Sequence, residues 1–356
     1  MERISIIGVD LAKRVFQVHG VDIDHKVIVQ KQLSRSEVVA WFSKLAPCLV
    51  GMEACATAHY WGQELSKLGH DVKLIPPAYV KPYVRRQKND RADAAAICEA
   101  VSRPSMRFVE IKTKDQQAIQ VLHRTRDLLV QQITQTSNAL RAHLAEFGWI
   151  FPQGNVGMSR AIGIVQDTDH VDLPIVAQQA MFSLVEQIKT LKQEIIKLDK
   201  QMAAWHKAQA DSQRLATIPG VGVITASAIV AAIGTGKQFK SGREFAAWVG
   251  LVPRQNSSGG KERLGHISKQ GNTYLRKLLV MGATGQLRGK YVDKAPGGEW
   301  FGQLVRRKSA RVASVALANK MARVAWAILT KGESYKKSAA ANGNNLEGAV
   351  LMTATA

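Results

Sequence analysis

The chain has 356 residues, 46% of them hydrophobic and 22% charged, so it is long enough for two or three domains and apolar enough to form cores. Its 49 Lys and Arg outnumber 28 Asp and Glu, and the net charge of +21 favours a polyanionic partner such as nucleic acid. No run approaches the roughly 18 apolar residues of a membrane span, and the first residues lack a signal-peptide pattern. We therefore expect a cytoplasmic protein without a membrane partner. The cysteines, Cys48, Cys55 and Cys98, lack metal-binding spacing and are expected to be reduced core thiols.

The charge is unevenly distributed. Residues 1–110 carry 16 basic and 12 acidic side chains, whereas residues 236–337 carry 21 basic and 5 acidic ones. A merely soluble or ribosome-like basic protein is one interpretation. A nearly neutral segment with clustered acids beside a strongly basic segment fits an enzyme that acts on phosphodiesters better.

The first 110 residues alternate β-rich and helical segments. Predicted strands cover residues 4–10, 15–21, 26–31, 48–52 and 72–75, and predicted helices cover residues 36–45, 59–68 and 91–101. This order predicts a mixed α/β domain that opens on an antiparallel meander. No Gly-rich phosphate loop is present, which argues against a dinucleotide-binding domain.

The middle of the chain is expected to be helical. Residues 115–147 have helical spacing, and from Leu184 to Trp205 apolar residues alternate spacings of four and three over three heptads. Two interpretations stay open, a coiled coil between subunits and a long helix packed on residues 115–147 of the same chain.

A helix, turn, helix pattern follows over residues 215–233, with Gly220 and Gly222 in a Pro-Gly-Val-Gly turn. The glycines allow a tight hairpin and expose backbone N–H groups at the next helix, which is a non-specific cradle for phosphate. Beyond it we expect a polar loop over residues 253–271 and apolar helices to about residue 329. The Ala/Asn/Gly-rich tail, residues 334–356, is expected to be disordered.

Four carboxylates are candidate metal ligands. Asp10 and Glu53 each end an apolar strand, and Asp90 and Asp93 lie three apart at a helix start, so both point to one side. Helix capping alone explains the last two as well as metal binding does. With two strand-end acids in addition, a divalent cation is favoured, and oxygen ligands suit Mg²⁺ or Mn²⁺.

Basic side chains precede the acid pair and surround a second candidate segment. Two interpretations of the first set are open: these side chains contact a nucleic-acid backbone, or they belong to a solvated basic loop. The set consists of Lys81, Arg85, Arg86, Lys88 and Arg91. Residues 254–263 set Ser257 and Ser258 among glycines and cations. Composition alone favours a flexible loop there, although a serine becomes a nucleophile where cations stabilise an attacked phosphate. The cations concerned are Arg254, Lys261 and Arg263, with Lys269 and His266 as weaker candidates.

Four blocks together resemble one family: Ile-Gly-Val-Asp-Leu-Ala-Lys, Met-Glu-Ala-Cys, Lys-Asn-Asp-Arg-Ala-Asp-Ala and Gly-Leu-Val-Pro-Arg-Gln-Asn-Ser-Ser-Gly-Gly-Lys. They are similar, in order over about residues 3–330, to the insertion-sequence one-ten family of DEDD transposases, related to the pilin-gene invertases. The last block is closest to the eleven-eleven branch.

The resemblance implies a ribonuclease-H-like (Holliday-junction-resolvase-like) domain over residues 1–110, a helical or coiled-coil region over 111–210, a mainly helical transposase domain over 211–333 and a tail over 334–356. It also implies that Asp10, Glu53, Asp90 and Asp93 are the DEDD metal ligands. A serine of residues 254–263 would form a covalent phosphoserine link with DNA: the family pattern favours Ser257, and a gap placed differently in that pattern selects Ser258.

The implied partners are target and donor DNA and a structured guide RNA that supplies the sequence choice. The implied assembly is a dimer that pairs into a tetramer and acts at the bacterial nucleoid. Two other functions remain: a metal-dependent nuclease or junction resolvase in which water attacks, and a nucleic-acid-binding protein without enzymatic activity.

Overall fold

The computed structural model describes residues 3–84, 89–167, 172–288, 292 and 294–336. The chain divides into two compact units, Met1–Gln117 and Ala118–Ala356. Each is considered by itself.

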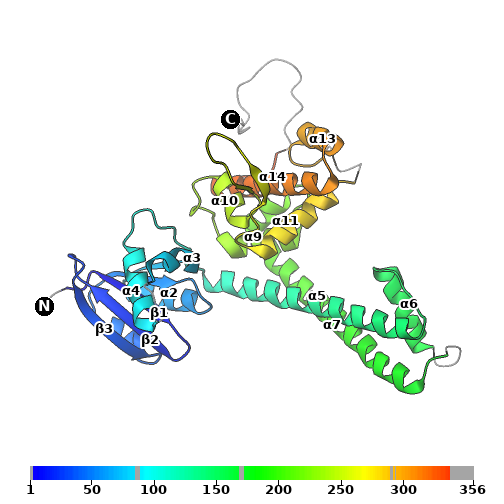
Figure 1. Ribbon diagram of the computed structural model, residues 1–356, viewed down its shortest axis with the longest axis horizontal. Helices are drawn as coiled ribbons and strands as arrows, with labels where there is room; N and C mark the ends of the chain where they lie inside the picture. The colour runs from blue at the N-terminus through cyan, green and yellow to red at the C-terminus, as the bar shows by residue number, and fades with distance from the viewer. Residues whose placement is uncertain (1–2, 85–88, 168–171, 289–291, 293, 337–356) are drawn as a thin grey trace, which may run out of the picture. The chain divides into compact units, whose positions relative to one another are not determined.

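The first unit is built on a five-stranded mixed sheet (Figure 1). Its strands are β1 (Ile6–Leu11), β2 (Val15–Val21), β3 (Val27–Ser34), β4 (Leu49–Glu53) and β5 (Asp71–Ile75), in the order β3-β2-β1-β4-β5. The pairs β1–β2 and β2–β3 are antiparallel, whereas β1–β4 and β4–β5 are parallel. The predicted mixed α/β domain with an opening meander is therefore confirmed.

Helices cover both faces of this sheet. They are α1 (Val38–Phe42), α2 (Ala58–Lys67), α3 (Pro77–Val80), the 3₁₀ turn η1 (Lys81–Tyr83) and α4 (Asp90–Val101). Alternate strand residues point to opposite faces. Ile7 and Val9 of β1 pack with α1 and α2 in one core, whereas the intervening Gly8 lies against α4. The sheet is thus a central layer between two different helical layers.

Long helices open the second unit: α5 (Lys114–Glu146, whose first residues belong to the first unit), α6 (Asn155–Gln166) and α7 (Ile175–Ala208). Leu144 of α5 packs with Val185 near the start of α7, and Ile119 of α5 packs with Met202 near its end, so the two helices run antiparallel. Arg126 Nε donates to Asp199 Oδ1 at 2.5 Å across them. Within the chain, α7 therefore packs on α5, as the intrachain interpretation of the heptad helix predicts.

The remaining elements share one core. They are α8 (Ala210–Ala216), α9 (Val223–Ile233), α10 (Gly242–Val249), β6 (Pro253–Gln255), β7 (Leu264–Ile267), α11 (Thr273–Gly285), α13 (Gly298–Arg307) and α14 (Ala310–Lys331). Helix α14 has the length and hydropathy of a membrane span, but half of that window is buried inside the unit. Because Leu317 and Met321 lie fully buried in the core, α14 is a core helix of this unit.

Two expectations need correction, and one helix was not predicted. The predicted polar loop contains a β-hairpin, β6–β7. Helix α6 was not predicted, because Gly157 and Gly163 weaken its helical pattern. Cys48 and Cys98 are buried as expected, whereas Cys55 is exposed. Of the tail expected to be disordered, residues 337–356 lie outside the described part of the chain.

Candidate active site

Three carboxylates converge in the first unit. One oxygen each from Asp10, Asp90 and Asp93 lies within 4.8 Å of the other two. Asp10 is the fifth residue of β1, Asp90 is the first residue of α4, and Asp93 follows one helical turn later. Asp90 is exposed, and the other two are half-buried. The structure therefore brings together three of the four predicted metal ligands.

The alternation of side chains along β1 and two glycines in the sheet produce this convergence. Asp10 shares a face of β1 with Gly8, the face that α4 covers. A Cβ on Gly8 would lie 2.2 Å from the carbonyl oxygen of Ala94, and one on Gly51 of β4 would lie 2.8 Å from Cβ of Val101. Only glycine lets α4 approach this closely, and that approach carries its first turn towards the end of β1.

Glu53 ends β4 on the same face as Gly51 and is half-buried. Burial raises its pKa, and the negative charges of Asp10 and Asp93 raise it further. Glu53 is outside the group of three converging oxygens, but it lies within the same electrostatic field. A half-buried carboxyl group whose charge is disfavoured by burial and by two neighbouring carboxylates is in an environment that a cation stabilises.

The donor set fits a small hard cation. All candidate ligands are carboxylate oxygens, which Mg²⁺ and Mn²⁺ prefer. Opposite ligands of Mg²⁺ are about 4.2 Å apart, at roughly 2.1 Å from the ion. The 4.8 Å spread of the three oxygens is therefore within a small side-chain movement of that geometry.

Only part of the predicted basic run can be placed. Lys81 begins η1 and Arg91 is the second residue of α4, and both are exposed. Arg85, Arg86 and Lys88 lie outside the described residues. Asn89 caps α4 by accepting a hydrogen bond from the backbone N–H of Arg91 at 3.0 Å.

The candidate serines occupy the tip region of the β6–β7 hairpin in the second unit. Both are exposed, and Ser257 Oγ accepts a hydrogen bond from the backbone N–H of Arg263 at 3.1 Å. Ser258 forms an isolated β-bridge with Lys261. Between them, Gly259 (φ 57°) and Gly260 (φ 75°) adopt the left-handed conformation that closes the turn.

The cations around the hairpin are exposed as well. Arg254 donates from Nη2 to the carbonyl oxygen of Ser268 at 3.2 Å, which ties the arginine to the opposite strand end. Lys261, Arg263 and Lys269 also lie at the surface, and so does His266 of β7. The hairpin and the residues directly after it thus expose two hydroxyls and four cations within a short segment.

Gly220 and Gly222 lie in the turn between α8 and α9 and have different surroundings. Gly220 has φ 88°, and an added Cβ would lie 3.0 Å from the carbonyl oxygen of Gly282 in α11. Gly222 is the N-cap of α9, with no side-chain cap and open space where a Cβ would be. Packing therefore accounts for Gly220, and only Gly222 leaves the N-terminus of α9 open.

A buried histidine is the polar feature that the sequence did not reveal. His123 is buried, with Nδ1 3.2 Å from Tyr274 Oη and Nε2 3.1 Å from Ser227 Oγ. Burial, assisted by Arg126, lowers the pKa of His123 to about 4. Burial also raises the pKa of Tyr274 to about 12. The signal was the alignment of His123 with the apolar face of α5.

Two family models match the chain. Residues 7–148 match a model described as a transposase of the DEDD IS110 type, and residues 212–295 match the model described as Transposase IS116/IS110/IS902 family. The first match contains all four candidate acids, and the second contains the serine hairpin.

Curated relatives agree along nearly the whole chain. A probable family 20 transposase of Pseudomonas aeruginosa is 47% identical over 334 residues, which are 94% of this chain and 99% of the relative. The transposase for insertion sequence element IS1111A of Coxiella burnetii is 40% identical over 94% of this chain and 92% of the relative. A pilin gene-inverting protein of Moraxella bovis is 30% identical over 35% of this chain and 38% of the relative. The chain therefore belongs to the IS116/IS110/IS902 family of transposases, and its enzymatic activity is DNA transposition.

Proposed function

We propose that this transposase cuts and rejoins DNA through a covalent link to Ser257, with a divalent cation held by Asp10, Glu53, Asp90 and Asp93. The observation that carries the proposal is the convergence of three carboxylates at one end of the sheet. The exposed serine hairpin among cations is the second element of the chemistry.

The first domain, residues 1–110 in this proposal, is ribonuclease-H-like. Support comes from its strand order, β3-β2-β1-β4-β5, in which an antiparallel meander continues into parallel β4 and β5. Acids at the ends of β1 and β4 and at the start of α4 fit the same architecture. Residues 111–210 are the helical connector, 211–333 the transposase domain and 334–356 a tail.

The chain's carboxylates would hold Mg²⁺ or Mn²⁺. Such an ion supplies charge neutralisation at a phosphate and orients it for in-line displacement. Asp10 and Asp93 are half-buried and fixed on regular elements, so they would set the position of the ion. The exposed Asp90 is open to contact with solvent or substrate.

Ser257 is the better-oriented nucleophile of the two. The backbone N–H of Arg263 donates to Ser257 Oγ, so the hydroxyl proton of Ser257 is not needed for that hydrogen bond and is free to leave. The same N–H would stabilise the negative charge that develops on Oγ. In the proposed step a bond forms between Ser257 Oγ and the DNA phosphorus, and the phosphorus–oxygen bond to the deoxyribose breaks. The serine proton passes, through solvent, to the departing hydroxyl. The reverse attack by a new hydroxyl rejoins the strand and restores the serine.

Contacts to the nucleic-acid backbone would come from the exposed cations. Arg254, Lys261, Arg263 and Lys269 would neutralise phosphates at the hairpin, and the open N-terminus of α9 at Gly222 would accept another. Lys81 and Arg91, together with Arg85, Arg86 and Lys88, would lead the strand to the acids. Because these contacts are not sequence-specific, a structured guide RNA that pairs with target and donor DNA would supply the sequence choice.

The proposed assembly is a dimer that pairs into a tetramer, in which one subunit's acids and another's serine complete a site. Support comes from the heptad face of α7. Leu191, Ile195 and Leu198 stay partly exposed although α5 packs beside them, so apolar surface is left for a second chain.

A suicide DNA substrate, nicked so that the cut strand's leaving segment diffuses away, tests the chemistry. We expect the full-length protein to be trapped on DNA in a denaturant-resistant adduct that maps to Ser257. Ser257→Ala would abolish the adduct, whereas Ser268→Ala, a serine of the same region, would retain it. Free ends without an adduct would instead support the alternative function, a nuclease or resolvase in which water attacks.

The guide RNA is tested separately. We expect nucleic acid to copurify with the protein and to be degraded by ribonuclease but not by deoxyribonuclease. Sequencing should recover RNA encoded beside the transposase gene. A protein that recombines DNA after complete ribonuclease treatment would overturn this part of the proposal and leave the serine chemistry intact.

A further inference from the structure

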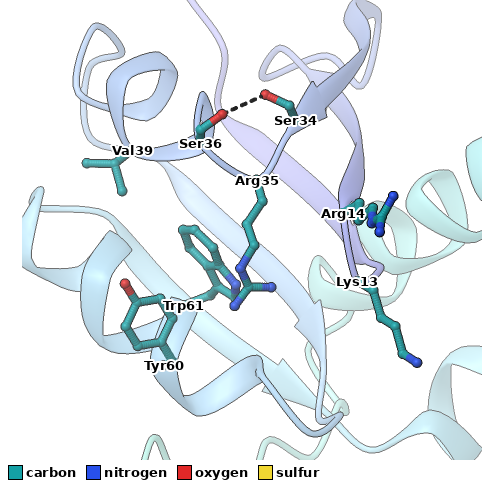
Figure 2. A pocket seen from close by; sticks show the side chains of 8 residues that line it. All are labelled: Lys13, Arg14, Ser34, Arg35, Ser36, Val39, Tyr60 and Trp61. Atoms are coloured by element: carbon teal, nitrogen blue, oxygen red, sulfur yellow. Dashed lines mark hydrogen bonds between the residues drawn. The ribbon is translucent and has the colours of Figure 1, made fainter.

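A pocket in the first unit combines cations with aromatic rings. It has a volume of about 620 Å³ and is lined by Lys13 and Arg14, Arg35, and Tyr60 and Trp61, with small side chains completing it (Figure 2). Among the described residues, no acidic side chain lines it. A pocket of this size holds a molecule larger than a simple anion.

The aromatic wall has one open ring and one buried ring. Tyr60 is 46% exposed, whereas Trp61 is 3% exposed. The rings meet edge to face with centroids 5.1 Å apart, and Trp61 also packs edge to face on Phe16 at 5.0 Å. Trp61 therefore joins Tyr60 to the core, and the nearly half-exposed Tyr60 remains accessible to a planar ligand.

Arg35 is held in place before any ligand arrives. Its guanidinium lies against the Trp61 ring (Figure 2), with its carbon 5.1 Å from that ring's centroid. The same carbon lies 5.8 Å from the ring centroid of Phe16. Its backbone N–H donates to the carbonyl oxygen of Arg14 at 2.9 Å, which brings the two cationic segments together. Stacking leaves the N–H edges of a guanidinium free to bind phosphate oxygens.

The pocket lies at the same end of the sheet as the acidic cluster, on the other face. Lys13 follows Asp10 by three residues, in the turn between β1 and β2, so their Cα atoms are at most about 11 Å apart. Trp61 belongs to the helical layer of α1 and α2, opposite α4. A few nucleotides of one strand span that distance.

We propose that this pocket binds an unpaired nucleotide of the DNA strand next to the acidic cluster. Its base would stack on Tyr60, and its phosphate would lie among Lys13, Arg14 and Arg35. A base inside a duplex has both faces covered, so only a single-stranded or extruded nucleotide can stack here. The proposal rests on the chain acting on DNA but not on the serine chemistry.

Photo-cross-linking tests the site directly. Full-length protein is incubated in chelator with single-stranded DNA that carries 4-thiothymidine, so the acids bind no metal and no strand is cut. We expect cross-links in the peptide that contains Tyr60, and we expect Tyr60→Leu to abolish them. Tyr60→Phe keeps the ring and should retain them. Cross-links that persist in Tyr60→Leu at the same peptide would overturn the proposal.

Affinity provides the second measurement, at fixed salt concentration. Arg35→Gln should weaken single-stranded DNA binding at least about five-fold more than Lys44→Gln, which removes the same charge at an exposed position outside the pocket. Unfolding curves of each variant check the fold, because Arg35 packs on Trp61. Equal losses in the two variants would overturn the proposal.

RNA of the same sequence forms the last arm. Cross-links to DNA at Tyr60 with equal or weaker ones to RNA support the assignment. Cross-links to RNA alone would overturn the assignment to a DNA strand. None of these measurements depends on Ser257. If the pocket does not bind a nucleotide, the cross-linking and affinity results change, whereas failure of the phosphoserine mechanism changes only the covalent adduct.

Discussion

Gly8 of β1 lies directly beneath Cys98 of α4, where an added Cβ would be 2.4 Å from the amide nitrogen of Cys98. The obstacle is helix backbone, which no side-chain rotation can relieve. The position of α4, and with it that of Asp90 and Asp93, therefore depends on the absence of one side chain in the neighbouring strand.

Gly8→Ala should destabilise the first unit by about 1–3 kcal/mol, because α4 must move away from the sheet. Chemical denaturation monitored by circular dichroism measures the change. Gly163→Ala in α6 is the control, since open space surrounds that position and alanine favours a helix. A Gly8→Ala variant as stable as the wild type would contradict the close packing.

Asp10→Asn should raise the melting temperature without metal and remove the shift that Mg²⁺ or Mn²⁺ produces. Without metal, the substitution removes one of the mutually repelling negative charges, which stabilises the fold. With metal, it removes a ligand of the ion, so the ion no longer stabilises the fold. Thermal melts with and without the ion measure both effects. Glu99→Gln, on the exposed face of α4, should keep the metal-induced shift. If Asp10→Asn keeps it too, the carboxylates do not form the metal site.

The stability of the second unit should depend on pH through His123. Its pKa is about 4 in the folded chain and 6.5 otherwise, so the folded state binds fewer protons between these values. The contribution of neutral His123 is fully present above about pH 6.5 and is lost as the pH falls towards 4, by about 3 kcal/mol. Denaturation at stepwise pH measures this slope. His123→Gln should flatten it, and the exposed His143→Gln should not.

The two turn glycines should respond differently to alanine. Gly220→Ala forces a positive φ and a close contact on a side chain, so it should cost about 1–2 kcal/mol of stability. Gly222→Ala has no close contact to relieve, so it should lower the melting temperature only by the cost of a poorer N-cap, and it should weaken DNA binding because its added methyl group occupies the open N-terminus of α9. Normal DNA affinity in Gly222→Ala would show that this turn is no phosphate cradle.

Much of the first unit follows from local pattern. Val15–Val21 is predicted and observed with the same limits, and the acids at positions 10, 53, 90 and 93 stand at element ends in both descriptions. Such features depend on the alternation of apolar and polar residues and on where short segments begin and end, and both can be read from the sequence. The shared face of Asp10 and Gly8 follows from the same period of two.

The features that depend on distant residues could not be predicted in this way. The strands β6 and β7 are three and four residues long and are exposed except at Ile267, so no alternation of buried and exposed residues reveals their pairing. The burial of His123 depends on Tyr274 and Ser227, which lie more than a hundred residues further along the chain. The pocket at Arg35 is lined by three segments that are separate in the sequence, residues 13–14, 34–39 and 60–61, and the Arg35 guanidinium stacks on Trp61.

The amino-acid sequence by itself determined which side chains carry the chemical groups for the reaction, because the identity of a carboxylate or a hydroxyl does not depend on the fold, whereas its reactivity depends on its surroundings. Only the tertiary structure decided which of them meet. Asp10, Asp90 and Asp93 converge because glycine at position 8 admits α4 onto the sheet, and that steric condition becomes visible only when strand and helix lie in contact.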